Sequence, residues 1–170
     1  MKKALLMDFV VDKENSKVNV RREFAASNDL VWRAWTEAEL LDQWWAPKPW
    51  RTETKTMDFQ PGGYWLYAMI GPDGTTHWCR EDYKSVLDQK NFSATDGFCD
   101  EHGKINPKFP LATWQVGFKG NGETTFVDVE IQYEKLEDLE VYIKMGFKEG
   151  FTAGLENLDE LLSRMQLKSN

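Results

Sequence analysis

The first third of the chain changes from a strand pattern to a helix pattern. Alternating apolar positions predict a strand over residues 17–26. Polar residues that can cap a helix come next, and they predict a short helix over residues 29–35. The tetrad Thr36-Glu37-Ala38-Glu39 has the form of a capping box, so we expect a second short helix to start there and to end before Pro47 and Pro49.

The middle of the chain has the pattern of successive antiparallel strands. Pro61-Gly62-Gly63, Gly71-Pro72-Asp73-Gly74 and Asn121-Gly122 are typical turn sequences, and each separates two apolar stretches. The expected strands cover residues 52–59, 64–70, 75–87, 91–98, 113–118 and 124–133.

The last part of the chain is helical. Residues 136–145 predict one helix, Gly146 predicts a break, and residues 149–166 predict a long amphipathic helix. This last helix would be about 27 Å long. Its apolar residues recur at intervals of four, three, four and three, as one buried face requires. They are Phe151, Leu155, Leu158, Leu162 and Met165.

This order of elements predicts an α+β fold. Antiparallel strands without intervening helices, followed by a helical end, place about six to seven strands in one sheet. The long C-terminal helix is the element large enough to cover the apolar face of that sheet, and the two short helices would close one end. We expect a single domain over residues 17–166, preceded by a lead-in segment or short extra strand over residues 1–16.

Charge and cysteine content narrow the function classes. The net charge is −7 and no run of Lys or Arg occurs, so we expect no nucleic-acid partner. Two cysteines are too few for a disulfide framework. Asp8 interrupts the apolar N-terminal stretch and no cleavage site follows, which argues against a signal peptide. No apolar run approaches the ~20 residues of a membrane span. We therefore expect a cytoplasmic protein without membrane insertion.

Aromatic residues are unusually frequent. They make up 14% of the chain, with 8 Trp and 10 Phe. Rings of this kind line apolar ligand pockets, but they also fill ordinary cores. Composition alone leaves both interpretations open.

Six stretches of the sequence together resemble a known family. Val31-Trp32-Arg33-Ala34-Trp35-Thr36 and Trp44-Trp45-Ala46-Pro47 look like the helical opening of activator-of-Hsp90-ATPase-homologue-1-like domains. Asp58-Phe59-Gln60-Pro61-Gly62-Gly63-Tyr64-Trp65 is similar to the Pro-Gly-Gly strand start of these domains, and Met69 to Gly74 to the hairpin that follows. Met145 to Phe151 and Leu155 to Leu162 resemble their C-terminal segment. The resemblance covers residues 17–166.

The resemblance implies the helix-grip fold of the START and Bet v 1-like superfamily (also called SRPBCC). Members bind lipids, steroids, hormones or polyketides under the long helix, some are polyketide cyclases, and the eukaryotic namesake stimulates a chaperone. Fold does not fix function, and the family brings no universal catalytic motif. One departure concerns Cys79-Arg80-Glu81-Asp82-Tyr83, which lacks the small residue that relatives often place before the Tyr. An acidic side chain there would either enter the cavity or face solvent.

The expected cavity has a defined set of lining residues. Aromatic and apolar side chains of neighbouring strands would face the long helix across it. These residues are Trp65, Tyr67, Met69, Tyr83, Trp114, Phe151, Leu155 and Leu158. The pattern does not settle which face of the strand 64–70 points inward.

Four carboxylates on predicted strands could carry chemistry. Glu81 and Asp96 would point inward together with Tyr83 if that face is the concave one, whereas Asp82 and Asp128 are expected to face solvent. A carboxyl group desolvated in an apolar cavity has a raised pKa and can act as an acid or base. Glu81, Asp96 and Tyr83 are therefore the catalytic candidates.

Two cysteines and two histidines flank the hairpin near residues 88–91. They are His77, Cys79, Cys99 and His102. A turn centred on Gln89 would place Cys79 opposite Cys99 and could form a zinc site. A turn one residue looser pairs Leu87 with Phe92, separates the thiols and suits the apolar pattern better. We therefore expect no metal at this hairpin.

Three functional hypotheses follow. The leading hypothesis is a module that binds a lipid-like or polycyclic apolar molecule in a dry, ring-lined cavity. The second is a cyclase or hydrolase-type enzyme that uses Glu81, Asp96, Tyr83 or His77 in that cavity. The third is a chaperone-linked protein-interaction module with an exposed apolar patch. No nucleotide-binding loop or nucleophile elbow occurs, so no cofactor is expected, and the sequence leaves a homodimer open.

Overall fold

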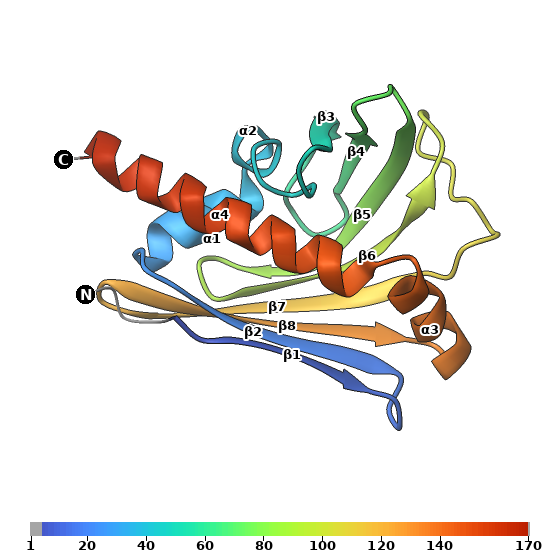
Figure 1. The fold of residues 1–170 in the computed structure, drawn as a ribbon, viewed down its shortest axis with the longest axis horizontal. Coiled ribbons are helices and arrows are strands. Elements are labelled where there is room, and N and C mark those ends of the chain that lie inside the picture. The colour runs from blue at the N-terminus through green and yellow to red at the C-terminus, as the bar shows by residue number, and fades with distance from the viewer. Residues whose placement is uncertain (1–4, 170) are drawn as a thin grey trace.

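One antiparallel sheet of eight strands forms the frame of the molecule (Figure 1). The computed structural model describes residues 5–169. The strand order in the sheet is β1-β2-β8-β7-β6-β5-β4-β3. The strands are β1 (Met7–Asp12), β2 (Lys17–Phe24), β3 (Arg51–Met57), β4 (Tyr64–Ile70), β5 (Thr76–Leu87), β6 (Asn91–Cys99), β7 (Ala112–Asn121) and β8 (Thr124–Tyr133).

Four helices accompany the sheet in the part of the chain that the structure describes. They are α1 (Asn28–Thr36), α2 (Ala38–Leu41), α3 (Leu136–Lys144) and α4 (Phe147–Ser169). Figure 1 shows α4 running across one face of the sheet, with α1 and α2 near one end of the sheet and α3 at the other. Gly146 separates α3 from α4 with a φ of 90°, a conformation that glycine adopts without strain. This is the helix-grip arrangement that the sequence predicted.

The apolar face of the sheet is buried under the helices. On β8, Val127, Val129, Ile131 and Tyr133 are buried, and the residues between them face the other way. Leu155, Leu158 and Leu162 of α4 are almost fully buried on the same side. The apolar face of the strands, with a period of two residues, and the apolar face of α4, with a period of about 3.6, therefore pack against each other in one core.

Aromatic rings fill the end of the core near α1. Trp32 of α1 lies with its ring centroid 5.0 Å from Phe118 and 5.8 Å from Phe59. Phe59 in turn lies 4.7 Å from the ring of Tyr83. Edge-to-face contacts of this kind contribute about 0.5–1.5 kcal/mol each beyond the area they bury. This end of the space between sheet and helices is closed by rings.

Three details differ from the sequence predictions. The sheet has eight strands rather than six or seven, because residues 7–12 pair with β2 as an additional edge strand. The second short helix, α2, ends at Leu41, well before Pro47. No capping box forms at its start, because Thr36 is still the last residue of α1 and Glu37 takes the N-cap position of α2. The Thr36 hydroxyl donates to the carbonyl of Trp32 at 2.8 Å.

The hairpin between β5 and β6 combines two registers. Leu87 pairs with Asn91, so the predicted pairing of Leu87 with Phe92 is wrong. A bulge at Lys84 then shifts the register, and Cys79 pairs with Phe98 rather than with Cys99. A bulge places one unpaired residue in one strand, which the apolar pattern alone does not reveal.

Candidate functional site

A cavity lies between the sheet and the N-terminal end of α4. Its volume is about 400 Å³. Residues from β4 to β8, from the segment after α2 and from the α3–α4 junction border it. They are Trp45, Pro47, Trp50, Tyr67, Met69, His77, Cys79, Asp96, Phe98, Trp114, Tyr133, Tyr142, Met145, Gly146, Phe147, Gly150 and Phe151.

Aromatic rings form the wall beneath α4. The ring of Trp114 on β7 lies 5.5 Å from Phe151 and 6.1 Å from Phe147, both nearly perpendicular to it. Trp45 completes the wall, with its ring centroid 5.8 Å from Trp114 and 6.1 Å from Phe151. This wall offers a planar apolar molecule both ring faces and ring edges.

Helix α4 holds Trp45 in place through the backbone around it. The Asn157 side chain is buried and donates to the carbonyl of Ala46 at 3.0 Å. Gly154 allows close approach, because a Cβ there would lie 3.0 Å from the carbonyl oxygen of Trp45. The indole N–H of Trp45 then donates to the Tyr67 hydroxyl at 3.0 Å. Helix α4 thus holds the backbone around Trp45, and Tyr67 holds its indole ring.

The mouth of the cavity lies beside three side chains with access to solvent. Trp50 is partly buried and stacks on the exposed His77, with ring centroids 5.5 Å apart. Met145, at the end of α3, is 52% exposed. On the same side, the Tyr142 hydroxyl donates to the carbonyl of Pro110 at 2.7 Å and ties α3 to the loop before β7. A ligand could enter between these residues.

The floor of the cavity is polar. Tyr67, Cys79 and Asp96 border the cavity from the adjacent strands β4, β5 and β6. Burial raises the pKa of Tyr67 well above its usual range, and burial likewise raises the pKa of the Cys79 thiol. Both groups are therefore protonated at neutral pH. The leading hypothesis expected a pocket without a polar cluster, and this expectation is wrong for the floor.

Asp96 has a carboxyl neighbour directly across the strand pair. Asp96 pairs with Glu81, and Glu81 is 4% exposed. Burial raises the pKa of Asp96 to about 7, against the opposing effect of the Trp114 indole N–H. Burial and the nearby Asp96 carboxyl raise the pKa of Glu81 well above its usual range. Asp96 remains partly exposed because its side chain borders the cavity.

The indole N–H of Trp114 is a buried hydrogen-bond donor without an acceptor at ordinary distance. Trp114 is 3% exposed, and its Nε1 atom forms no hydrogen bond of ordinary length among the described residues. Its N–H nonetheless lies near enough to Asp96 to favour the charged carboxylate. An unpartnered buried N–H costs free energy, so it is a candidate contact for a bound molecule.

The predicted cavity residues divide into two groups. Tyr67, Met69, Trp114 and Phe151 border the cavity. Trp65, Tyr83, Leu155 and Leu158 do not border it and are buried in the core elsewhere. The reason is that the cavity occupies only one end of the space under α4, whereas rings and leucines pack the other end.

The four carboxylates lie as their strand positions require. Glu81 and Asp96 point to the inner face, whereas Asp128 is exposed on the outer face. Asp82, the acidic residue before Tyr83, does not enter the cavity, because it lies on the opposite face of β5 from Glu81 and Tyr83. There the Arg80 guanidinium donates to it at 2.9 Å. Tyr83 stays 3% exposed in the ring cluster near α1.

The cysteines and histidines do not converge. Cys79 faces the cavity floor, whereas Cys99 pairs with Trp78 and points to the other face of the sheet. His102 lies in the loop after β6, where its side chain is 78% exposed. Within residues 5–169, no three potential metal ligands come together.

Several residues that line the cavity were not predicted from the sequence. They are Trp45, Pro47, Trp50, Phe98, Tyr133, Tyr142, Met145 and Phe147. A usable signal existed for Tyr133, which shares the inner face of its strand with Val129 and Ile131. Trp50 and Tyr142 carry no such signal, because an irregular segment and a short helix position them.

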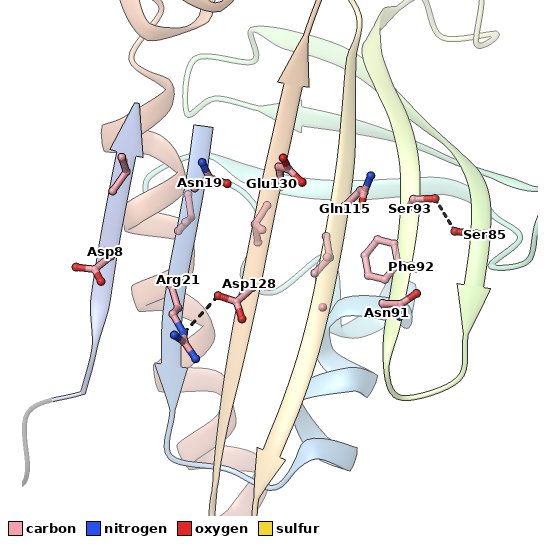
Figure 2. Close-up of a pocket in the computed structure, with 15 residues that line it drawn as sticks. Asp8, Asn19, Arg21, Ser85, Asn91, Phe92, Ser93, Gln115, Asp128 and Glu130 are labelled. Atoms are coloured by element: carbon pink, nitrogen blue, oxygen red, sulfur yellow. Dashed lines mark hydrogen bonds and ion pairs between the residues drawn. The ribbon is translucent and has the colours of Figure 1, made fainter. Parts of the chain in front are cut away.

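A second hollow lies on the outer face of the sheet, and Figure 2 shows it in close-up. Its volume is about 690 Å³. The side chains on it are mainly polar, and several already pair with one another. Arg21 lies 3.4 Å from Asp128, and the hydroxyl oxygens of Ser85 and Ser93 are 2.6 Å apart. It lacks the aromatic walls of the cavity under α4, so we regard that cavity as the candidate site.

No helix within the described residues is long and apolar enough to cross a membrane. The sequence and the structure were also compared with known proteins. The family model described as activator of Hsp90 ATPase homolog 1-like protein matches residues 25–163. Comparison with curated proteins gives no match.

Solved structures with the same fold come from several bacteria. A protein from Mycobacterium smegmatis is 27% identical, with a TM-score of 0.85 over 94% of this chain and 97% of the other. A protein from Arthrobacter aurescens is also 27% identical, with a TM-score of 0.87 over 92% and 91%. One from Silicibacter pomeroyi that carries the family's name is 19% identical, with a TM-score of 0.69 over 88% and 99%, a likeness of fold alone.

Proposed function

The chain belongs to the activator of Hsp90 ATPase homolog 1-like family, and from this premise we propose that it binds an apolar small molecule with a polycyclic body in the cavity under α4. The observation that carries the proposal is the cavity itself. Its volume of about 400 Å³ lies within the range typical of ligand pockets, and aromatic rings line it.

The ring wall suits a flat molecule better than a flexible chain. Trp45, Trp114 and Phe151 stand at steep angles to one another, so a planar body could lie on one ring face and against the edges of the others. A two-ring aromatic body buries area comparable to a large aromatic side chain, about 150–250 Å². At about 25 cal/mol per Å², this contributes about 4–6 kcal/mol. Association itself costs free energy, so this gross contribution limits the dissociation constant to tens of micromolar at the tightest.

Calorimetric titration with 2-naphthylmethanol tests this proposal. Gly150 borders the cavity near the start of α4, and a Cβ there meets only Pro47, at 3.8 Å. The Gly150→Leu variant should therefore place its side chain in the cavity and abolish binding, while the helix remains intact. The matched control is Glu156→Leu, which introduces the same side chain at an exposed position of α4.

Two results would count against ligand binding in this cavity. One is the absence of heat of binding to the folded wild-type protein at millimolar ligand. The other is equal binding by Gly150→Leu and Glu156→Leu, which would place the ligand elsewhere.

A second candidate function is an enzyme that acts on the bound molecule, and one observation favours it. Asp96 borders the cavity, and its pKa of about 7 lies where a carboxyl can both accept and donate a proton at neutral pH. Mass spectrometry of a recovered ligand tests this candidate. A product formed by the wild type and not by Asp96→Asn supports catalysis, whereas unchanged ligand supports binding alone.

A further inference from the structure

We propose that the ligand carries a protonated amine, and that its ammonium group lies against the Asp96 carboxyl on the cavity floor. This inference rests on the proposed function, because it assumes that the cavity binds a ring-containing molecule. It adds the charge of that molecule and the residue that recognises it.

Asp96 on the floor and Glu81, buried beside it, are two carboxyl groups without a cationic partner. Asp96 and Glu81 are paired across β5 and β6 and face the same interior. Neither forms an ion pair with any Lys, Arg or His among residues 5–167. The cation nearest in sequence, Arg80, binds Asp82 and the carbonyl of Gly103 instead. A buried carboxylate is usually paired with a cation, so the ionised form of Asp96 lacks a positive partner here.

The rings above the floor suit a cation as well. Trp45, Tyr67, Trp114 and Phe151 all border the same cavity as Asp96. An ammonium group is attracted to the faces of aromatic rings, most strongly where water is excluded. Ring walls and an acidic floor together form the arrangement that recognises organic cations. A carboxylate ligand, in contrast, would be repelled by the negative charge of Asp96.

The indole N–H of Trp114 favours the negatively charged form of Asp96. The Trp114 N–H has no hydrogen-bond acceptor at ordinary distance, and it favours the charged form of Asp96. Glu81 is more deeply buried, and the pKa of its carboxyl is raised by burial and by Asp96. We therefore assign the negative charge to Asp96 and the neutral, protonated state to Glu81.

The titratable groups around Asp96 determine how the affinity for an amine changes with pH. Glu81 and Cys79 on β5, Tyr67 on β4, Tyr133 on β8 and Tyr142 on α3 all interact with Asp96, and burial raises the pKa of each. His77 at the mouth is the single lining side chain of the described residues that can become a cation. An ammonium beside Asp96 lowers the pKa of that carboxyl, so the amine binds more tightly as the pH rises through about 7.

Three probes with the same ring body test the inference: 2-naphthylmethylamine, 2-naphthylmethanol and 2-naphthoic acid, titrated calorimetrically into the full chain near neutral pH. We expect the amine to bind at least tenfold more tightly than the alcohol, and the acid to bind most weakly. Asp96→Asn should reduce the affinity for the amine about tenfold and change that for the alcohol less than twofold. The control, Asp128→Asn, removes an exposed carboxyl from the outer face and should change neither.

The possible outcomes distinguish a failure of the amine inference from a failure of the proposed ligand binding in the cavity. If none of the three probes binds, the cavity function fails and the amine inference fails with it. If the alcohol binds as tightly as the amine, or the acid binds best, the cavity function stands and the amine inference is overturned. Should Asp96→Asn not fold, the wild type alone decides. The amine affinity relative to the alcohol must rise at least threefold from pH 5.5 to pH 7.5, and a flat ratio overturns the inference.

Discussion

Asp96 carries most of the chemistry of the candidate site. Its strand places it on the inner face of the sheet, and neighbouring rings take most water away from it. Its pairing with Glu81 adds a second carboxyl instead of a cation. A buried carboxyl group without a cationic partner destabilises the folded protein at neutral pH. Such groups with perturbed pKa values are concentrated at functional sites.

The raised pKa of Asp96 has a defined effect on stability. Because burial raises the pKa of the folded state to about 7 from a usual value of 3.8, the folded protein holds this proton more tightly than the unfolded chain. The contribution is therefore fully favourable below about pH 4 and is lost as the pH rises to about 7. Glu81 acts in the same direction, because its pKa is raised too.

Asp96→Asn tests this effect. We predict that the free energy of unfolding of the wild type falls between pH 5 and pH 8 by on the order of 1–3 kcal/mol more than that of the variant, at about 1.4 kcal/mol per pKa unit. The lower end is expected, because the carboxyl reaches water through the cavity. Urea unfolding at both pH values measures it, with Asp128→Asn as control. Equal pH dependence in the wild type and Asp96→Asn would show that Asp96 is not desolvated.

At the scale of elements, the sequence pattern predicted regular structure well and irregular structure poorly. Alternation located β8 correctly, because one of its faces is buried and the other is wet. The capping-box pattern at Thr36 failed, because Thr36 still belongs to α1 and Glu37 takes the N-cap position of α2. The bulge at Lys84 had no apolar signal, and it alone decides that Cys79 and Cys99 lie on opposite faces.

Two glycines in α4 differ in why they are needed. An added Cβ at Gly150 would meet only Pro47, at 3.8 Å, whereas at Gly154 it would lie 3.0 Å from the Trp45 carbonyl oxygen and 3.3 Å from that of Trp44. Alanine is favoured over glycine in a helix by about 0.5–1 kcal/mol. Gly154 therefore serves close packing against the segment that positions Trp45.

The substitutions Gly150→Ala and Gly154→Ala form a matched pair. We predict that Gly150→Ala raises the free energy of unfolding by about 0.5 kcal/mol. Gly154→Ala should lower it by about 1–3 kcal/mol, because α4 must move away from a fixed backbone. Thermal and urea unfolding measure both. Equal effects of the two substitutions would contradict the packing role of Gly154.

At the scale of the whole molecule, the sequence predicted the helix-grip fold and the family, because their motifs are local and recur in order. It could not place the cavity. A cavity is the space left after all side chains have packed, so its position depends on how Trp32, Phe59 and Tyr83 fill the opposite end. This is why Trp65 and Leu158 were expected at the site but lie in the core, whereas Trp50 and Tyr142 border it.

The central claim is that a ring-containing molecule binds between α4 and the sheet, and the tryptophans themselves can report it. Trp45, Trp50 and Trp114 border the cavity, whereas Trp32 lies in the ring cluster near α1 and Trp78 interacts with Lys55. The measurement is a titration of ¹⁵N-labelled protein with 2-naphthylmethanol, followed through the indole N–H signals. We predict saturable shifts of the Trp45, Trp50 and Trp114 signals, with Trp32 and Trp78 unchanged. Shifts confined to Trp78, or no shift in any indole of the folded protein, would contradict the account.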